Sequence, residues 1–309
     1  MPTRSIIPMK IFNKTLLLLL FPITLLVADN SNKQLSQLDF SSLVNDFIEE
    51  DNILKKTINL SGKQRMFTQR MSKLALEISL NIQKDASQKK LKKLSSLYAK
   101  TLKAFKDGDE DLGIQKATDA KVLEQITVVE KEWKPFSEHI TKIAEGKDDG
   151  ASLTYVIKNN ERLLASSNEL VKRYEASNTS SNYLEKARLR VVNVAGRQRM
   201  LTQKMTKEKL LLLKGKKEYA SKLEDTIKLF DTSLTALIKG DKSQNISKPT
   251  NEKIIKQLNV VSKLWGQLKP LYEKKKNSVR ELAVIISKNT TLLKEMNAMV
   301  QMAEKELEY

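Results

Sequence analysis

One stretch of this 309-residue chain occurs twice, and this duplication constrains the fold more than any other feature. Residues 59–73 read NLSGKQRMFTQRMSK and residues 193–207 read NVAGRQRMLTQKMTK, with nine of the 15 positions identical at a constant offset of 134. A weaker match pairs residues 105–109 with residues 237–241 at an offset of 132. A repeat of this length predicts a duplicated structural unit, so we expect the function to depend on both copies.

The composition predicts long helices. The chain has only nine glycines and six prolines, 30% charged residues and 6% aromatic residues, which is typical of helix-rich proteins. Each copy is expected to form four helices joined by short turns, and short turns make consecutive helices antiparallel. We therefore predict an all-α fold of two tandem up-down-up-down four-helix bundles, over residues 40–176 and 180–309.

The expected helices follow from the apolar periodicity and the positions of the breakers. They cover residues 41–83, 88–106, 116–144 and 151–176 in the first copy, and 182–214, 217–239, 251–268 and 270–308 in the second. Pro135 is expected to kink or divide the third helix. The segment 271–307 has no glycine or proline and is predicted to be one long helix. The polar run 178–182 is expected to separate the copies, with one continuous helix as the alternative.

The N-terminus resembles an export signal. Arg4, Lys10 and Lys14 precede an apolar run of 12 residues, 16–27, which Ala28 follows. A spanning helix needs about 20 apolar residues, so a signal peptide over residues 1–28 is favoured over a membrane anchor. The main variant is an uncleaved anchor over residues 6–27. We expect a periplasmic protein, either released or tethered to the inner membrane.

Several classes of function are disfavoured by composition. The chain has no cysteine, which excludes disulfides, thiolate metal sites and cysteine nucleophiles. Its one histidine, His139, has no counterpart in the second copy and is expected to be a surface or partly buried helix residue. No pair of acidic residues recurs as a catalytic signature. We therefore expect no enzymatic activity, no cofactor and no metal.

The net charge is +18 and falls to about +15 without residues 1–28. The lysines are dispersed among acidic residues, and export argues against a nucleic-acid partner. A solvated helical surface is the favoured interpretation. The alternative is a positive field that concentrates small anions or favours an anionic membrane face.

Placed on a helix, the repeated motif has two distinct faces. An apolar stripe expected in the core contains Leu60, Phe67, Met71, Leu74 and Ile78. A small, polar face lies nearly opposite, and it contains Ser61, Gly62, Arg65, Thr68, Gln69 and Ser72. The second copy builds the same polar face from Ala195, Gly196, Arg199, Thr202, Gln203 and Thr206.

The polar face suggests an anion site. A glycine one turn before an arginine is expected to let a second helix come close. If the two faces pack together, Arg65 and Arg199 meet and repel each other unless an anion lies between them. A guanidinium matches a planar oxyanion with parallel N–H donors, and Thr68, Thr202, Gln69 and Gln203 would add neutral hydrogen bonds. The alternatives are a solvated face, or a face that serves helix packing alone.

The pattern N-x-[SA]-G-[KR]-Q-R-M-[FL]-[ST]-Q-[KR]-M resembles the P-box segment of NarX-type nitrate/nitrite sensors, and more closely the PilJ-type domain of pilus-linked chemotaxis transducers. This resemblance implies a periplasmic four-helix bundle that works as a dimer and holds nitrate between motif helices, chiefly by the arginine of the R-M pair. That role falls on Arg65 and Arg199, and Gly62 and Gly196 match the family glycine. Because both copies lie on one chain, the pairing is either an intrachain pseudo-dimer or a homodimer.

We therefore predict an exported sensory protein that binds a small oxyanion and reports the bound state to a membrane-bound sensor kinase or chemoreceptor. The alternative is a structural module whose duplicated face docks onto a chemotaxis, pilus or sensor component without a small ligand.

Overall fold

A computed structural model describes residues 53–177 and 183–305, and these residues form eight α-helices and one short 3-10 helix. The α-helices are α2 (Ile53–Ser79), α3 (Lys84–Asp107), α4 (Ala120–Ala144), α5 (Ala151–Ala176), α6 (Tyr183–Leu213), α7 (Tyr219–Lys239), α8 (Glu252–Glu273) and α9 (Val279–Lys305). Both copies belong to one compact unit, residues 47–309. The expected signal segment 1–28, the anchor 6–27, the helix start 41–52 and the boundary 178–182 lie outside the described residues.

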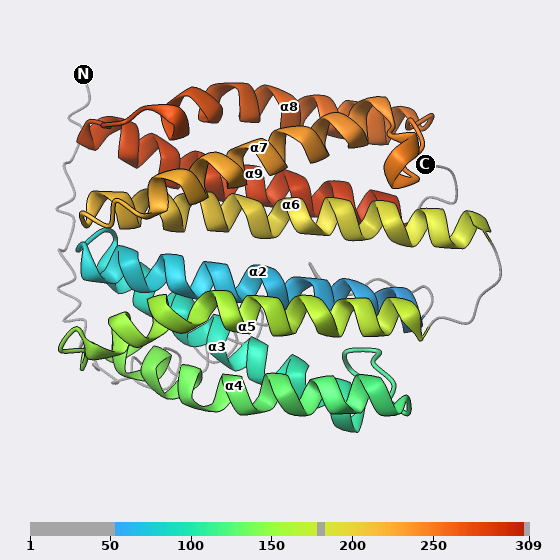
Figure 1. Ribbon diagram of the computed structural model, residues 1–309, viewed down its shortest axis with the longest axis horizontal. Helices are drawn as coiled ribbons and strands as arrows, with labels where there is room; N and C mark the ends of the chain where they lie inside the picture. The colour runs from blue at the N-terminus through green and yellow to red at the C-terminus, as the bar shows by residue number, and fades with distance from the viewer. Residues whose placement is uncertain (1–52, 178–182, 306–309) are drawn as a thin grey trace, which may run out of the picture. The chain divides into compact units, whose positions relative to one another are not determined.

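Each copy is a four-helix bundle. In the first, α2 and α4 each pack against α3 and α5, and in the second, α6 and α8 each pack against α7 and α9. Consecutive helices run in opposite directions (Figure 1). The predicted all-α fold of two tandem up-down-up-down bundles is therefore confirmed.

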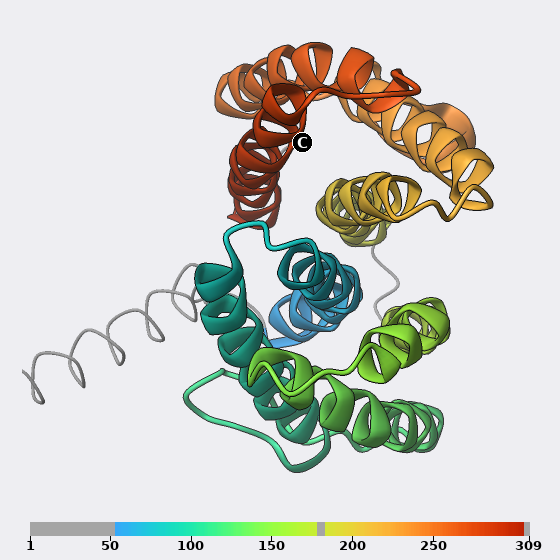
Figure 2. The same cartoon turned by 90° about the vertical axis from the view of Figure 1, so that its left-hand side faces the viewer.

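The two bundles meet along α2 and α6, which carry the repeated motif. These helices run side by side in the same direction (Figure 1), and an end-on view shows α2–α5 on one side of the seam and α6–α9 on the other (Figure 2). The copies are therefore related by an approximate two-fold axis that runs along the helices. The pairing that the sequence left open occurs within one chain.

Helix α2 is buried on all sides. Every residue from Thr57 to Ile78 is buried except Arg70, which is half-buried. The predicted apolar stripe is buried, as expected. The polar face opposite is also buried, and it lies in the seam with α6, so it is not a solvated face.

Helix ends in the first copy match the predicted limits near residues 107, 144, 151 and 176, but three other limits differ by four residues. The first turn lies earlier than predicted, because α2 ends at Ser79 and α3 begins at Lys84, and α4 begins at Ala120 rather than at residue 116. Helix α4 begins one residue after Asp119, whose carboxylate accepts a hydrogen bond from Val122 N at 2.9 Å. This is the cap expected of an aspartate before a helix. Helix α4 passes through Pro135 without being divided.

The last helix of the second copy differs from the prediction. Residues 271–307 do not form one helix, because α8 passes Pro270 and ends at Glu273, and α9 starts only at Val279. The reversal predicted at residues 268–270 therefore lies at residues 274–278, and it brings α9 against both α6 and α8.

A capping box starts α9. Ser278 N donates to the Glu281 carboxylate at 2.8 Å, and Glu281 N donates back to Ser278 Oγ at 3.3 Å. The side-chain amide of Asn277 also donates to Leu271 O at 2.9 Å and closes the turn. A serine three residues before a glutamate is a readable start signal. The segment has no glycine or proline, so its continuous helical pattern hid this start signal.

Two glycines provide a matched test of the turn geometry. Gly240 and Gly215 both have φ +80°, but a Cβ on Gly240 would lie 2.8 Å from Lys248 N, whereas one on Gly215 meets nothing within 4 Å. Gly215→Ala is expected to cost about 1–2 kcal/mol from the left-handed backbone alone. Gly240→Ala should cost at least ~1 kcal/mol more, because the backbone must also shift. Urea unfolding of the two variants measures the difference, and equal losses would contradict this account of the loop.

Candidate functional site

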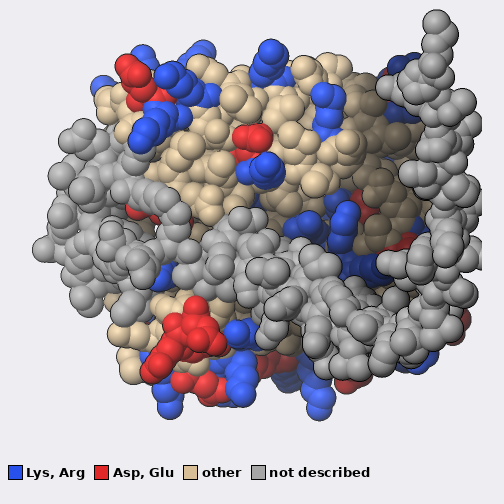
Figure 3. Space-filling view, turned by 180° about the vertical axis from the view of Figure 1, so that it is seen from behind, with Lys and Arg blue, Asp and Glu red and all other residues tan. Residues whose placement is uncertain are grey.

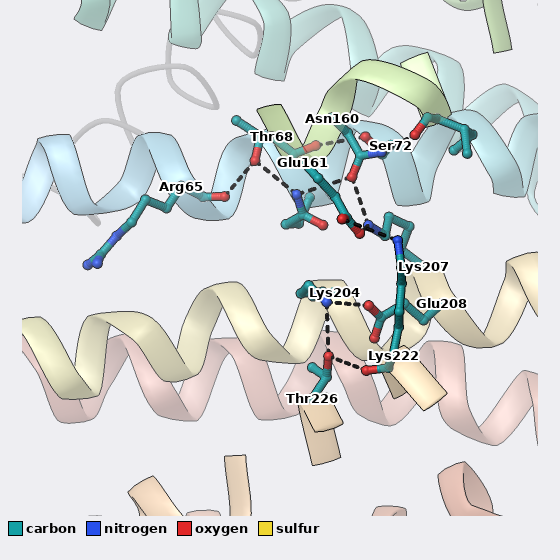
Figure 4. A network of polar contacts seen from close by, with 12 residues as sticks. Arg65, Thr68, Ser72, Asn160, Glu161, Lys204, Lys207, Glu208, Lys222 and Thr226 are labelled. Atoms are coloured by element: carbon teal, nitrogen blue, oxygen red, sulfur yellow. Dashed lines mark hydrogen bonds and ion pairs between the residues drawn. The ribbon is translucent and has the colours of Figure 1, made fainter. Parts of the chain in front are cut away.

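The arginines of the two motifs meet in the seam between the copies. Arg65 and Arg199 are 2% and 1% exposed, and the Arg65 side chain points from α2 towards α6 (Figure 4). A Cβ placed on Gly196 would lie 3.3 Å from Arg199 Nη2 and 3.8 Å from Arg65 Nη2. The two guanidinium groups are therefore neighbours at one point of the seam.

Each arginine binds an asparagine of the other copy. Arg65 Nη2 donates to Asn193 Oδ1 at 2.8 Å, and Arg199 Nη2 donates to Asn59 Oδ1 at 2.8 Å. These asparagines are the first residues of the two motifs. No role was predicted for these asparagines from the sequence, although their identity in both copies was a usable signal.

A second pair of asparagines binds the arginines from within each copy. Arg65 Nη1 donates to Asn168 Oδ1 at 3.0 Å, and Arg199 Nη1 donates to Asn297 Oδ1 at 2.9 Å. All four acceptors are neutral amide oxygens. In the described part of the chain, no carboxylate forms a direct ion pair with either guanidinium. The four asparagines therefore accept hydrogen bonds from the two guanidiniums but do not neutralise their positive charge.

The seam is electropositive because two positively charged side chains are buried in it. Burial, together with the charges of Arg197 and Arg199, lowers the pKa of Arg65 to about 9, while Glu175 opposes the shift. Burial also lowers the pKa of Arg199 to about 10, against the attraction of Glu304. Both shifts show that the loss of hydration outweighs the attraction of the nearby carboxylates.

The motif glycines make room for the arginines. A Cβ on Gly62 would lie 3.2 Å from Arg65 Nη2 and would meet no other atom within 4 Å, and a Cβ on Gly196 would meet only guanidinium nitrogens. The nearest side-chain neighbours of both Cβ positions are guanidinium nitrogens, so the space that these glycines leave is occupied by the arginines. The guanidinium folds back over the glycine one turn before it, and a side chain there would displace the guanidinium.

The predicted threonines bond to their own helices. Thr68 Oγ1 donates to Arg65 O at 2.9 Å, and Thr202 Oγ1 donates to Arg199 O at 2.8 Å. Their hydroxyl protons are therefore already engaged, although each hydroxyl oxygen still accepts a hydrogen bond from the glutamine that follows it.

The predicted glutamines point into a second polar layer. Gln69 Nε2 donates to Asn160 Oδ1 at 3.3 Å, and Gln203 Nε2 donates to Asn289 Oδ1 at 3.0 Å. The Oε1 atoms of both glutamines are buried and have no hydrogen-bond partner among the described residues. The predicted site residues thus divide into an arginine–glycine layer and a glutamine layer farther along the seam.

Two buried lysines cross the seam in this second layer. Lys207 Nζ donates to Asn160 Oδ1 at 2.7 Å, and Lys73 Nζ donates to Asn289 Oδ1 at 3.4 Å. Each bond joins one copy to the other, and each lysine is the last residue of its motif. The motif therefore contacts the opposite copy near both of its ends.

The lysine layer is not symmetric. Lys207 lies 3.7 Å from Glu161 of the first copy, and Glu161 also pairs with Lys222 at 3.3 Å (Figure 4). At the equivalent position of α9 the chain has Thr290. Lys73 pairs instead with Glu77 of its own helix, at 3.4 Å. An ion pair across the seam at this level thus holds α5 to α6, and Thr290 cannot provide one for α9.

Residues 53–177 and 183–305 show neither a cluster of metal-ligating side chains nor a membrane-spanning helix. No group of three or more histidine, aspartate or glutamate side chains there is arranged to hold a metal ion. In the same residues, no helix combines the length and apolar character required to cross a membrane. His139 is half-buried, contacts Ser152 Oγ at 3.0 Å and stacks on Tyr155.

Comparison with known proteins identifies the repeated unit. The model of the PilJ family, the N-terminal domain of type IV pili methyl-accepting chemotaxis transducers, matches residues 51–157 and again residues 185–287. The chain belongs to this family. Each match contains one motif, so this PilJ chain carries two tandem domains whose motif helices pair with each other.

Part of the chain is also similar to a chemotaxis protein. Over 113 residues, the PilJ chain is 32% identical to the methyl-accepting chemotaxis protein McpN of Pseudomonas aeruginosa PAO1. The matched segment is 36% of this chain and 21% of that relative, so it spans about a fifth of the relative's length. No solved structure matches the chain.

The buried lysine of the second layer predicts a pH dependence. Burial lowers the pKa of Lys207 to about 8 from an ordinary 10.5. Between these values the unfolded chain binds a proton that the folded chain does not, so the free energy of unfolding rises with pH. Lys207→Met should reduce this rise between pH 8 and 10, as measured by urea unfolding. Lys222→Met is the control, because its partly exposed ammonium has a raised pKa. An unchanged slope in Lys207→Met would show that Lys207 stays charged.

Proposed function

We propose that this chain is a sensory protein that binds a small planar oxyanion, nitrate or nitrite, between Arg65 and Arg199. The observation that carries the proposal is the meeting of two buried guanidiniums whose direct partners are neutral amide oxygens. Like charges repel strongly where water is excluded. A bound anion would offset this repulsion and restore the charge balance of the seam.

Donors for such an anion remain on both arginines. A guanidinium has five N–H donors, and each arginine gives one Nη1 and one Nη2 hydrogen bond to asparagines. Arg199 Nε is buried without a partner in the described residues, and the Arg65 Nε contact with Gly62 O is long, at 3.4 Å. In this proposal the remaining N–H groups are the donors to the oxygens of one anion.

The pseudo-dimer supports a sensory role. One arginine comes from each copy, so a bound anion would change the attraction between α2 and α6 rather than the packing within one bundle. Because α2 and α6 run in parallel, any relative shift would be carried along their full length. We propose that a membrane-bound chemoreceptor or sensor kinase reads this shift, in keeping with the chemotaxis transducers of the family. Periplasmic location and the lack of enzymatic activity are parts of the same proposal.

A structural role is the second candidate. The reciprocal Arg–Asn bonds between the copies favour it, because they hold the seam together without any ligand. In this case the motif would serve packing alone. Docking of the motif face onto an external partner is disfavoured, since the face is buried within the chain.

Anion-dependent unfolding distinguishes the two candidates. The thermal midpoint of the parent protein should rise with nitrate or nitrite, by an amount that corresponds to about 2.7 kcal/mol when the ligand is at 100 times its Kd. Arg65→Gln and Arg199→Gln should each abolish this rise without unfolding the protein, because one guanidinium no longer clamps the ligand. The matched control is Arg162→Gln, since Arg162 is 71% exposed and pairs with Glu132 outside the seam. Calorimetric titration provides the affinity.

The opposite result has an equally clear meaning. If nitrate, nitrite and acetate shift the parent no more than chloride does, the ligand proposal is wrong. In the structural alternative, both arginine variants would lose stability to the same extent with and without anion.

A further inference from the structure

The same loop follows the second helix of each copy. Asp109 and Ile114 form an isolated antiparallel bridge after α3, and Asp241 and Ile246 form the same bridge after α7. Each loop is entered through a glycine with matching backbone angles, φ 84° and ψ 159° in the first copy and φ 80° and ψ 159° in the second. The two loops are equivalent structural elements and can be compared residue by residue.

The charge of this loop is reversed between the copies. Lys239 stands where the first copy has Asp107, and Lys242 stands where it has Glu110. Residues 107–119, here called the acidic loop, contain five acidic residues and one lysine. Residues 239–251, the basic loop, contain three lysines and one acidic residue. One backbone fold therefore carries opposite charges at two places in the same chain.

The lysines of the basic loop are not neutralised within the loop. Its one carboxylate, Asp241, accepts hydrogen bonds from Ser243 Oγ at 2.6 Å and from Gln244 Nε2 at 2.6 Å, and these bonds lower its pKa. The three lysines, Lys239, Lys242 and Lys248, form no ion pair with a described residue, and they line a hollow of about 480 Å³. The hollow therefore presents positive charge to an outside partner.

Both loops lie at the same end of the helices. They are found where α2 and α6 begin, on opposite flanks of the seam (Figure 1). Acidic side chains gather over this end of the first copy, and basic side chains gather over the same end of the second (Figure 3). The chain thus has a negative flank and a positive flank at one level along its axis.

We propose that the acidic loop of one chain docks into the basic loop of a second copy, so that chains associate side by side in rows. Parallel chains placed in line bring the two flanks together at the same height. The contact joins two different surfaces, so each chain keeps one free loop through which a further copy can be added. An anionic membrane surface would also attract the lysines. It would repel the acidic loop at the same end, which favours a second copy as the partner.

The interaction is expected to be weak and sensitive to salt. Exposed ion pairs contribute little individually and are screened at high ionic strength. Sedimentation velocity of the full chain in non-ionic detergent should show association at about 20 mM salt and its loss at about 500 mM salt. The proposal does not depend on the oxyanion site, because no ligand is needed.

Charge reversal tests the pairing directly. The basic-loop variant Lys239→Glu/Lys242→Glu and the acidic-loop variant Asp107→Lys/Glu110→Lys should each weaken self-association at least about tenfold. A mixture of the two variants should associate again, because each one supplies the charge that the other lacks. The chain that carries all four changes should also recover. The control Lys214→Glu/Lys216→Glu makes the same charge change in the exposed turn at the opposite end of α6 and should have no effect.

Three outcomes would overturn the proposal, provided that circular dichroism shows folded variants. The first is a parent chain that stays monomeric at every salt concentration. The second is association that the loop variants leave unchanged or that the mixture does not restore. The third is binding to phosphatidylglycerol vesicles that Lys239→Glu/Lys242→Glu abolishes while self-association is absent, which would identify a membrane surface as the partner.

Discussion

The structure depends on the burial of two like charges at one seam. Removing a guanidinium from water is costly, and two neighbouring guanidiniums add repulsion to that cost. Four asparagine oxygens offset part of it, and two of these cross from the opposite copy. The same contacts therefore join the bundles, and their neutral oxygens do not cancel the positive charge between them. The packing interface and the proposed anion site would be two aspects of this one arrangement.

Duplication within a single chain permits differences that a homodimer cannot have. Identical subunits present the same residues on both sides of a two-fold axis. Here the two sides have diverged, since Lys207 pairs across the seam with Glu161 while Lys73 pairs with Glu77 on its own helix. The loops after α3 and α7 have diverged in charge in the same way. The arginine layer has kept its symmetry, and the differences between the two copies lie outside this layer.

Local signals in the chain were sufficient for most of the fold. Apolar periodicity and short turns predicted the four helices of each copy and their antiparallel order. The prediction failed at residues 271–307, where a continuous helical pattern outweighed the capping signal of Ser278 and Glu281. The reversal after the third helix was predicted at residues 268–270, next to Pro270, and it lies instead at residues 274–278, where the capping signal marks it.

The sequence by itself determined that two equal units exist and that Arg65 and Arg199 hold equivalent positions in them, since a repeated pattern is visible without coordinates. Only the tertiary structure decided that these arginines meet inside one chain and that asparagines of the opposite copy bind them. It also decided that the space beside the motif glycines is occupied by guanidiniums. The reason is physical: periodicity defines which face of a helix a residue occupies, but the partner of a buried polar face depends on how separate helices pack in space.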